Sequence, residues 1–173
     1  MLRMMTTHTR RRLLSLCLTM VSVLGVSAVV RSEPVATVSP EEIQALIQDN
    51  QGKVVVLNFW ASWCPPCLEE FPDIIEVYNE YHSEGLEVIA VSMNADDELE
   101  DIDNFLQDYL PPFTIYRSAS QDETFYAGVI EPWYGEIPMT LIYDASGERI
   151  HVHKKALTHE ELVQDVTALL PSL

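Results

Sequence analysis

Two cysteines separated by two prolines are the residues of this sequence whose types and spacing most clearly suggest chemistry. Cys64 and Cys67 enclose Pro65 and Pro66, directly after an apolar run at residues 54–60 and directly before a helical pattern. Two thiols at this spacing in the first turn of a helix can close into a disulfide and reopen. The sequence therefore predicts a redox-active disulfide between Cys64 and Cys67.

Half of a zinc site is the other interpretation of such a pair, and it needs two more Cys or His ligands at matching spacing. The only other cysteine, Cys17, lies in an N-terminal targeting segment. His151 and His153 alternate on one face of a predicted strand, but no third ligand is evident near them, so a solvated edge strand is favoured. No metal and no cofactor are predicted.

The two thiols are expected to have different roles. Cys64 is the predicted nucleophile, because the dipole and the unpaired N–H groups at the amino end of a helix favour a thiolate. Cys67, one turn further along, is the predicted resolving thiol, which attacks Cys64 and releases the reduced partner. Pro65 and Pro66 lack an N–H group, so fewer backbone donors are available to the thiolate.

Residues 1–28 have the composition of an export signal or an N-terminal membrane anchor. Four arginines precede an uncharged stretch at residues 13–30, and small residues at 26–28 suit a signal peptidase. The uncharged stretch is also close to the length that spans a bilayer. We therefore expect the protein outside the cytoplasm, in the periplasm or at the outer face of the cytoplasmic membrane, where thiols are not automatically kept reduced.

The charge of the chain excludes some partners. The formal net charge is −17, and all 27 acidic residues lie after residue 28. Such a surface argues against nucleic acid and against an anionic membrane surface as partners. Solubility or adaptation to habitat is the favoured interpretation of the acidity, and steering of basic partner proteins is the alternative.

The elements that must position the cysteines follow from hydrophobic periodicity and capping signals. Capping boxes begin at Ser39 and Thr158, and residues 29–38 resemble a linker. About 135 residues, 39–173, remain for a single domain. The expected elements are helices near 40–52, 65–81, 99–109 and from 159 onward, and strands at 54–59, 86–92, 113–116, 139–143 and 149–153.

This order predicts an α/β fold with a central mixed sheet. The first half supplies parallel strands joined by helical crossovers, and the hairpin at residues 139–153 adds an antiparallel edge. With helices on both faces of the sheet, this is the layout of a thioredoxin fold.

The segment from Asn58 to Cys67, followed by Glu70 and Pro72, resembles the active-site segment of exported, often membrane-anchored thioredoxins of the TlpA/ResA type. Residues 137–144 resemble their proline loop and the strand after it. The resemblance covers roughly residues 39–173. It implies a thiol–disulfide oxidoreductase that reduces Cys-containing exported proteins, with apocytochrome c as one candidate, and that receives electrons from an upstream membrane thiol–disulfide donor.

The resemblance also implies roles for residues around the cysteines. Glu70 would accept the proton of Cys67, because Asn58 stands where most thioredoxins carry a buried Asp. The alternative is that Glu70, like Glu69, is solvated helix surface.

Trp63, Pro65, Ile137 and Pro138 are the predicted substrate-binding residues. Trp63 is expected to stay partly exposed, and Pro138 is expected to be cis. Ile137, just before it, would present its backbone to an extended partner segment, as in strand addition.

Three other activities are compatible with parts of this pattern. An oxidase or isomerase of the same fold would differ mainly in redox potential. A thiol peroxidase is disfavoured because its Thr-x-x-Cys context is absent from the sequence. A redox-inactive docking module would use the cleft without turnover, and insulin reduction would distinguish it from the enzymes.

Overall fold

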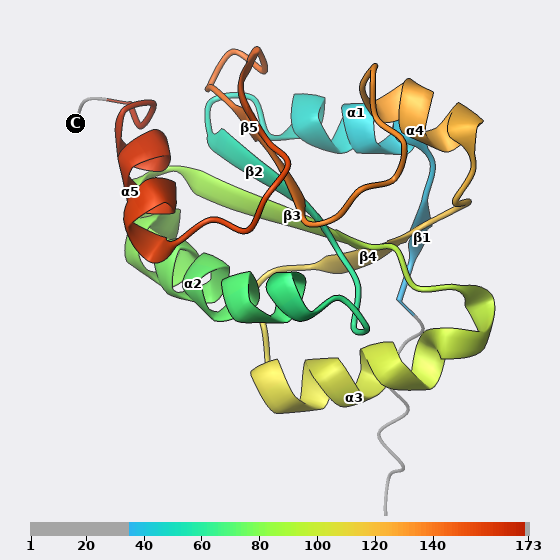
Figure 1. Ribbon diagram of the computed structural model, residues 1–173. Coiled ribbons are helices and arrows are strands. Elements are labelled where there is room, and N and C mark those ends of the chain that lie inside the picture. Colours follow the sequence, from blue (N-terminus) through green and yellow to red (C-terminus); the bar gives the residue numbers. More distant parts are fainter. Residues whose placement is uncertain (1–34, 172–173) are drawn as a thin grey trace, which may run out of the picture. The chain divides into compact units, whose positions relative to one another are not determined.

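A computed structural model describes residues 35–171 of the protein. Its centre is a six-stranded mixed sheet with the order β1-β4-β3-β2-β5-β6 (Figure 1). The strands are β1 (Thr37–Val38), β2 (Val54–Trp60), β3 (Leu86–Ser92), β4 (Ile115–Ser118), β5 (Met139–Tyr143) and β6 (Arg149–His153). The helices are α1 (Pro40–Asp49), α2 (Pro65–Tyr81), α3 (Leu99–Tyr109), α4 (Glu123–Val129) and α5 (His159–Thr167).

The predicted export signal, residues 1–28, lies outside the described residues. None of the helices within residues 35–171 is long and apolar enough to cross a membrane.

Strand β2 is the centre of the sheet, and all seven of its residues are buried. It pairs in parallel with β3, from Val54 opposite Leu86 to Trp60 opposite Ser92, and antiparallel with β5. Apart from Asn58 the strand is apolar, which suits this position, because a strand covered on both faces has no solvent side on which to place polar residues. The loop before α2, residues 61–64, begins where this strand ends and is called the cysteine loop below.

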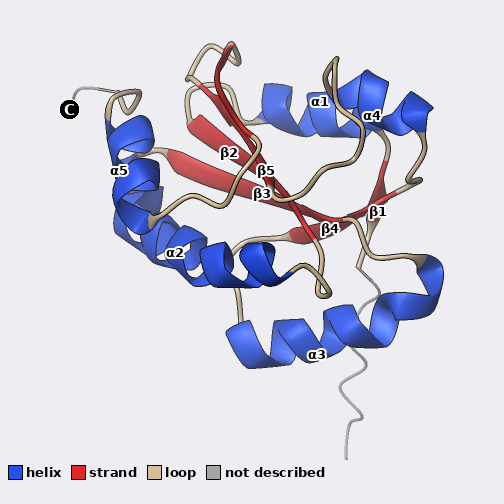
Figure 2. Ribbon diagram, viewed as in Figure 1, coloured by secondary structure: helices blue, strands red, loops and turns tan. Residues whose placement is uncertain are grey.

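The helices cover both faces of the sheet. Helices α1 and α4 lie together on one face, and α2 and α5 lie together on the other (Figure 2). Trp60 of β2 packs against Phe71 of α2 and Phe105 of α3, with ring centroids 4.9 Å and 4.2 Å apart. These three rings connect the strand before the cysteines, the helix after them and helix α3, and so hold the cysteine loop between rigid elements.

The α/β thioredoxin-type architecture predicted from the sequence is confirmed, and several element bounds agree. Strands β3, β5 and β6 occupy the predicted residues, and α2 ends at Tyr81 as expected. Strand β4 begins two residues later than predicted. Phe113 precedes that strand and packs in the core, with its ring centroid 5.2 Å from that of Tyr78.

Two elements were missed by the sequence analysis. Residues 37 and 38, which it placed in the linker, form strand β1 beside β4. Helix α4 has only seven residues and contains Gly128, which weakens its periodic signal. A Cβ atom at Gly128 would lie 2.8 Å from Cβ of Pro40, so the glycine permits a close approach of α4 to α1.

Candidate active site

Cys64 and Cys67 form a disulfide at the amino end of α2. Cys64 is the residue immediately before the helix, with an extended backbone, and Cys67 lies in the first helical turn. Cys64 is 5% exposed and Cys67 is 1% exposed. Both residues are buried, and Cys64 is slightly the more exposed of the two.

The backbone around Cys64 leaves few donors for its sulfur. Pro65 and Pro66 have no N–H group, and the next two N–H groups, those of Cys67 and Leu68, donate to the carbonyl oxygen of Cys64 at 3.0 Å and 3.1 Å. A thiolate at Cys64 would therefore depend on the helix dipole more than on direct hydrogen bonds from the first turn. This arrangement stabilises the thiolate less than a first turn without proline would.

The proline loop before β5 lies against the disulfide. The Ile137–Pro138 peptide bond is cis, as predicted. Sγ of Cys64 lies 3.8 Å from the carbonyl oxygen of Ile137. A disulfide sulfur carries no proton, so this is a packing contact in the oxidised protein. It brings the backbone of residue 137 beside the sulfur that is expected to react.

Glu70 lies on α2 one turn after Cys67 and is buried, with 2% of its surface exposed. Glu69 beside it is exposed. Burial raises the pKa of the Glu70 carboxyl from 4.5 to about 7, while hydrogen bonds from Thr140 and from the backbone of Leu157 oppose the rise and the charge of Asp73 adds to it. Glu70 is therefore a carboxyl group that can gain or lose a proton near neutral pH.

A chain of polar side chains connects Glu70 to the centre of the sheet. Nδ2 of Asn58 donates to Oγ1 of Thr140 at 2.9 Å, and Oγ1 of Thr140 donates to Oε1 of Glu70 at 3.2 Å. Within residues 35–171 nothing hydrogen-bonds to Oε2 of Glu70. One carboxylate oxygen is thus held in place, and the other remains able to accept a proton. Thr140 was not among the site residues predicted from the sequence.

A second polar network holds the residues before Cys64. Oδ1 of Asn94 accepts the backbone N–H of Ser62 at 3.0 Å, and Nδ2 of Asn94 donates to Oγ of Ser62 at 2.7 Å. Oε2 of Glu98 accepts from the indole of Trp63 at 3.1 Å, from Nδ2 of Asn94 at 3.2 Å and from the backbone N–H of Ala95 at 2.8 Å. Asn94 and Glu98 therefore position the cysteine loop.

Asn94 and Glu98 were not among the site residues predicted from the sequence. A polar residue two positions after the buried strand at residues 86–92 was the available signal, because the carboxyl ends of neighbouring parallel strands lie at the same edge of a sheet.

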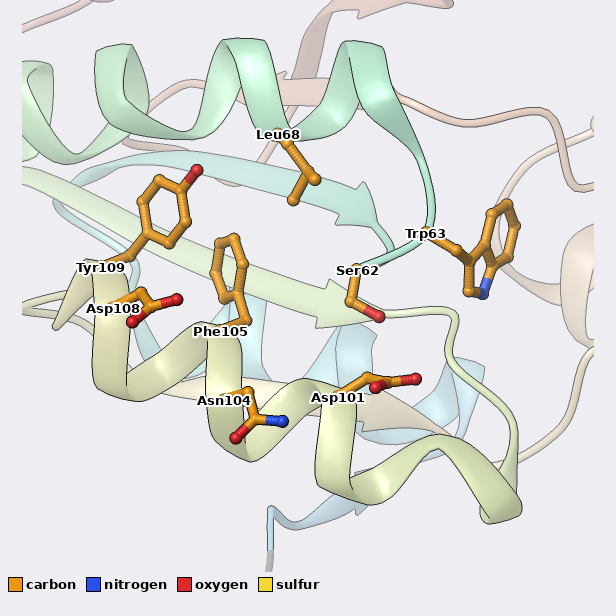
Figure 3. A pocket seen from close by; sticks show the side chains of 8 residues that line it. All are labelled: Ser62, Trp63, Leu68, Asp101, Asn104, Phe105, Asp108 and Tyr109. Atoms are coloured by element: carbon orange, nitrogen blue, oxygen red, sulfur yellow. The ribbon is translucent and has the colours of Figure 1, made fainter.

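A groove of about 450 Å³ adjoins the cysteine loop. One wall comes from the loop and the start of α2, and the other comes from α3 (Figure 3). Aromatic rings of Phe105 and Tyr109 and carboxylates of Asp101 and Asp108 face this space (Figure 3). Trp63, which also lines it, is 54% exposed, in agreement with the prediction that it stays accessible.

The expectation that no third ligand lies near the two histidines of β6 is wrong. Asp165 of α5 lies within reach of both His151 and His153. Asp165 lies 12 residues after His153, on another element, so the spacing of the two histidines gave no sign of it. The chain turns after β6, and α5 brings Asp165 back to the same face of the sheet.

The sequence is similar to a known protein family and to individual proteins within it. Residues 34–148 match the family model described as Redoxin. The chain is 33% identical over 129 residues to "Thiol-disulfide oxidoreductase ResA" of Oceanobacillus iheyensis, covering 72% of this chain and 62% of that protein. The chain thus spans less than two thirds of that relative's length.

Solved structures agree with this similarity. A putative thiol:disulfide interchange protein DsbE from Chlorobium tepidum superposes with a TM-score of 0.61 at 29% identity, covering 72% of this chain and 85% of that one. A secreted disulfide oxidoreductase from Mycobacterium tuberculosis superposes with a TM-score of 0.57 at 27% identity, covering 70% of this chain and 86% of that one.

Proposed function

Because the chain belongs to the redoxin family, we propose that it is a thiol–disulfide oxidoreductase whose Cys64–Cys67 pair reduces disulfides of proteins outside the cytoplasm. The observation that carries the proposal is the position of Cys64. Its sulfur lies at the amino end of α2 and 3.8 Å from the Ile137 carbonyl oxygen, where an extended partner segment could pair with the loop backbone.

The first step is attack by the Cys64 thiolate on one sulfur of a partner disulfide. The partner S–S bond breaks, a mixed disulfide with Cys64 forms, and the other partner sulfur leaves as a thiolate that takes a proton from solvent. The dipole of α2 favours the attacking thiolate. Pro138 and Ile137 would hold the partner segment alongside, so that its sulfur approaches Cys64 in line.

The second step is attack by Cys67 on the sulfur of Cys64. The mixed disulfide breaks, the Cys64–Cys67 bond forms, and the second partner sulfur leaves reduced. The partner gains two electrons in total and the protein loses two. Cys67 must first give up its proton, and Glu70 is the proposed acceptor because a pKa of about 7 suits proton transfer at neutral pH.

Partner recognition is proposed to use the groove beside Trp63. Its acidic and aromatic lining, with Asp101 and Asp108 beside Phe105 and Tyr109, complements a Lys or Arg side chain close to the partner's cysteine. Replacing Asp101 and Asp108 together by Asn should raise KM for a Lys-containing disulfide peptide and leave kcat nearly unchanged. A peptide without basic residues should show no change in KM, and an equal change for both peptides would contradict this recognition mode.

The location and the electron donor are part of the same proposal. Residues 1–28 have the composition of an export signal or anchor, and the 27% identical protein from Mycobacterium tuberculosis is described as secreted. The proposed partners are Cys-containing exported proteins, with apocytochrome c as one candidate. An upstream membrane thiol–disulfide protein would return the pair to the dithiol form.

The reduction potential of the Cys64–Cys67 couple tests the direction of electron flow. We expect a value nearer to that of thioredoxin, about −270 mV, than to that of a strong disulfide oxidant, about −120 mV. Equilibration with glutathione redox buffers, followed by thiol trapping, measures it. A value near about −120 mV would instead support an oxidase of the same fold.

A further inference from the structure

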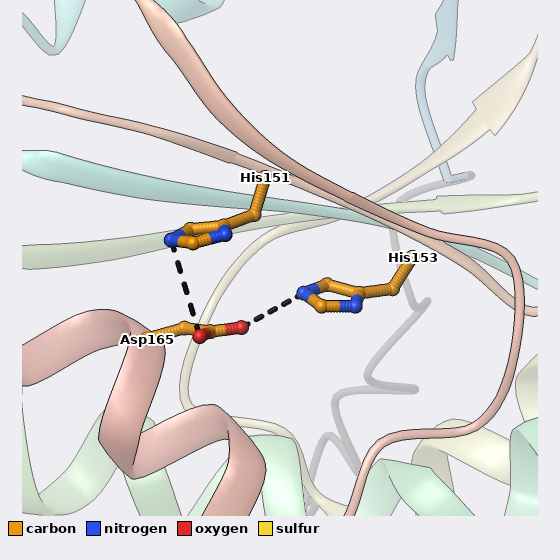
Figure 4. A group of neighbouring side chains, drawn as sticks. All are labelled: His151, His153 and Asp165. Atoms are coloured by element: carbon orange, nitrogen blue, oxygen red, sulfur yellow. Dashed lines mark hydrogen bonds and ion pairs between the residues drawn. The ribbon is translucent and has the colours of Figure 1, made fainter.

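Three side chains from β6 and α5 converge on one point (Figure 4). Nε2 of His153 lies 2.8 Å from Oδ2 of Asp165, and Nε2 of His151 lies 3.9 Å from Oδ1 of the same carboxylate. The two nitrogens and one carboxylate oxygen all lie within 4.8 Å of one another. Both imidazole rings therefore present the same type of atom to a single carboxylate.

The fold places these groups together for local reasons. His151 and His153 are two residues apart on a strand, so their side chains point to the same face of the sheet. Their rings lie nearly parallel, with an interplanar angle of 17° and centroids 5.9 Å apart. Helix α5, which begins after the Thr158 capping box, passes over that face and brings Asp165 opposite both rings.

We propose that His151, His153 and Asp165 bind a divalent first-row transition-metal ion, for which Zn²⁺ is the test ion. Imidazole nitrogens are ligands that zinc, copper and nickel ions prefer, and a carboxylate completes a three-ligand set. Three protein ligands leave at least one coordination position for water or for another ligand. Mg²⁺ and Ca²⁺ are excluded as preferred ions, because both favour sites made of oxygen atoms alone.

The distances agree with such a site. Zinc lies about 2.0 to 2.1 Å from imidazole nitrogen and about 2.0 to 2.2 Å from carboxylate oxygen, so ligand atoms around a tetrahedral ion are about 3.3 Å apart. His153 lies 2.8 Å from one oxygen of Asp165 and His151 lies 3.9 Å from the other, so each histidine already lies close to this spacing from one carboxylate oxygen.

The alternative is an ordinary hydrogen bond from His153 to Asp165, with His151 too far from the carboxylate to form one. That arrangement requires a proton on Nε2 of His153, whereas a metal ion would use the Nε2 lone pair of each histidine. The three side chains are 34%, 24% and 17% exposed for His151, His153 and Asp165, so an ion could enter from solvent.

A second group of residues offers a matched control. Glu76, Glu80 and His159 also lie within 4.8 Å of one another, but this group supplies only one imidazole, and both of its carboxylates are exposed. Its stronger oxygen character makes it the weaker site for Zn²⁺. Substitution of His159 should thus leave the first site intact.

The test is titration of the full-length protein with ZnCl2 after removal of metal by a chelator. Every variant carries Cys17→Ser and is kept in the disulfide form, so that thiols do not bind the ion. We expect one equivalent of tightly bound Zn²⁺, with at least about tenfold weaker binding in His151→Ala, His153→Ala and Asp165→Asn. His159→Asn should bind as the parent does.

Co²⁺ supplies a second measurement, because its visible absorption depends on the ligands and their geometry. The absorption band should appear in the parent protein and be lost in Asp165→Asn, which preserves the side-chain shape if the alanine variants fail to fold. Turnover is not used as the measurement, because His153 pairs with Thr140, the residue that bonds to Glu70. No bound equivalent, or binding lost only in His159→Asn, would overturn the proposal.

Discussion

Thr140 donates a hydrogen bond across 3.2 Å to Oε1 of Glu70, joining strand β5 to helix α2 inside the core. Thr140 in turn accepts from Asn58, so the hydroxyl proton is directed toward the carboxylate. The carboxyl group of Glu70 is thereby held in one orientation, one turn after Cys67. Its second oxygen is the atom proposed to exchange a proton with the resolving thiol.

Glu70→Gln should slow release of the reduced partner. Loss of a positioned proton acceptor is expected to cost about 100-fold in the rate of that step near neutral pH, where Glu70 titrates with a pKa of about 7. Single-turnover reduction of a disulfide peptide, followed by rapid thiol trapping, measures the step. Glu69→Gln, at an exposed position of the same helix, is the matched control. Equal, small effects of both substitutions would assign Glu70 a structural role only.

The stability of the oxidised protein should depend on pH through Glu70. The folded-state pKa, about 7, is above the ordinary value of 4.5, so the folded state retains a proton that the unfolded state releases. Its contribution to stability is present below about pH 4.5 and is lost as pH rises through about 7, by at most about 3 kcal/mol.

Urea unfolding at several pH values measures this dependence. The parent protein should lose stability between about pH 5 and pH 8, and Glu70→Gln should lose much less over the same interval. Parallel curves for the two proteins would show that Glu70 is ionised in the folded state throughout.

Pro66→Ala should make the protein a weaker reductant. Cys64 is the residue before α2, and Pro66 occupies the second helical position, whose N–H group normally bonds to the side chain of the residue before the helix. An added N–H group there should lower the Cys64 thiol pKa by about one unit and raise the reduction potential by about 30 mV.

Pro65→Ala is the control for that change, because the first helical position does not supply the usual donor to the preceding side chain. Thiol pKa values from iodoacetamide rates, together with glutathione equilibration, give both quantities. The interpretation fails if the Pro65 substitution has the larger effect.

Glu98→Ala should loosen Trp63 without unfolding the protein. Oε2 of Glu98 accepts three hydrogen bonds, one of them from the Trp63 indole, and Trp60 is fully buried elsewhere. The Trp63 indole N–H resonance should shift and exchange faster with solvent, while that of Trp60 should change little. The expected loss of stability is about 1 to 3 kcal/mol. Glu100→Ala, an exposed acidic residue on α3, should leave both resonances in place.

The sequence predicted those parts of the site that depend on short-range pattern. The apolar run of β2, the cysteines and the helix after them lie within one continuous segment, so their relative placement follows from periodicity. The sequence could not decide whether Glu70 is buried or lies on the solvated surface of the helix. The decision depends on Thr140 and Leu157, two residues far away in the sequence that contact the Glu70 carboxyl group.

The parts that could not be predicted depend on contacts between distant segments. Asn94 bonds to Ser62 across 32 residues, and Asp165 faces His153 across 12 residues and a change of element. Neither pairing leaves a periodic signal. Strand β1, with two residues, is too short to be distinguished from a linker, and it forms because β4 offers an open edge.

The central claim is that Cys64 attacks and Cys67 resolves, and one measurement tests both roles. Reduced parent, Cys67→Ser and Cys64→Ser proteins are each mixed with an oxidised peptide, acid-quenched and analysed by mass spectrometry with peptide mapping. The parent should reduce one peptide disulfide and form the Cys64–Cys67 bond, and Cys67→Ser should accumulate a mixed disulfide on Cys64. Cys64→Ser should react far more slowly. A parent that leaves the peptide oxidised, or an adduct that forms readily on Cys67 in Cys64→Ser, would contradict the account.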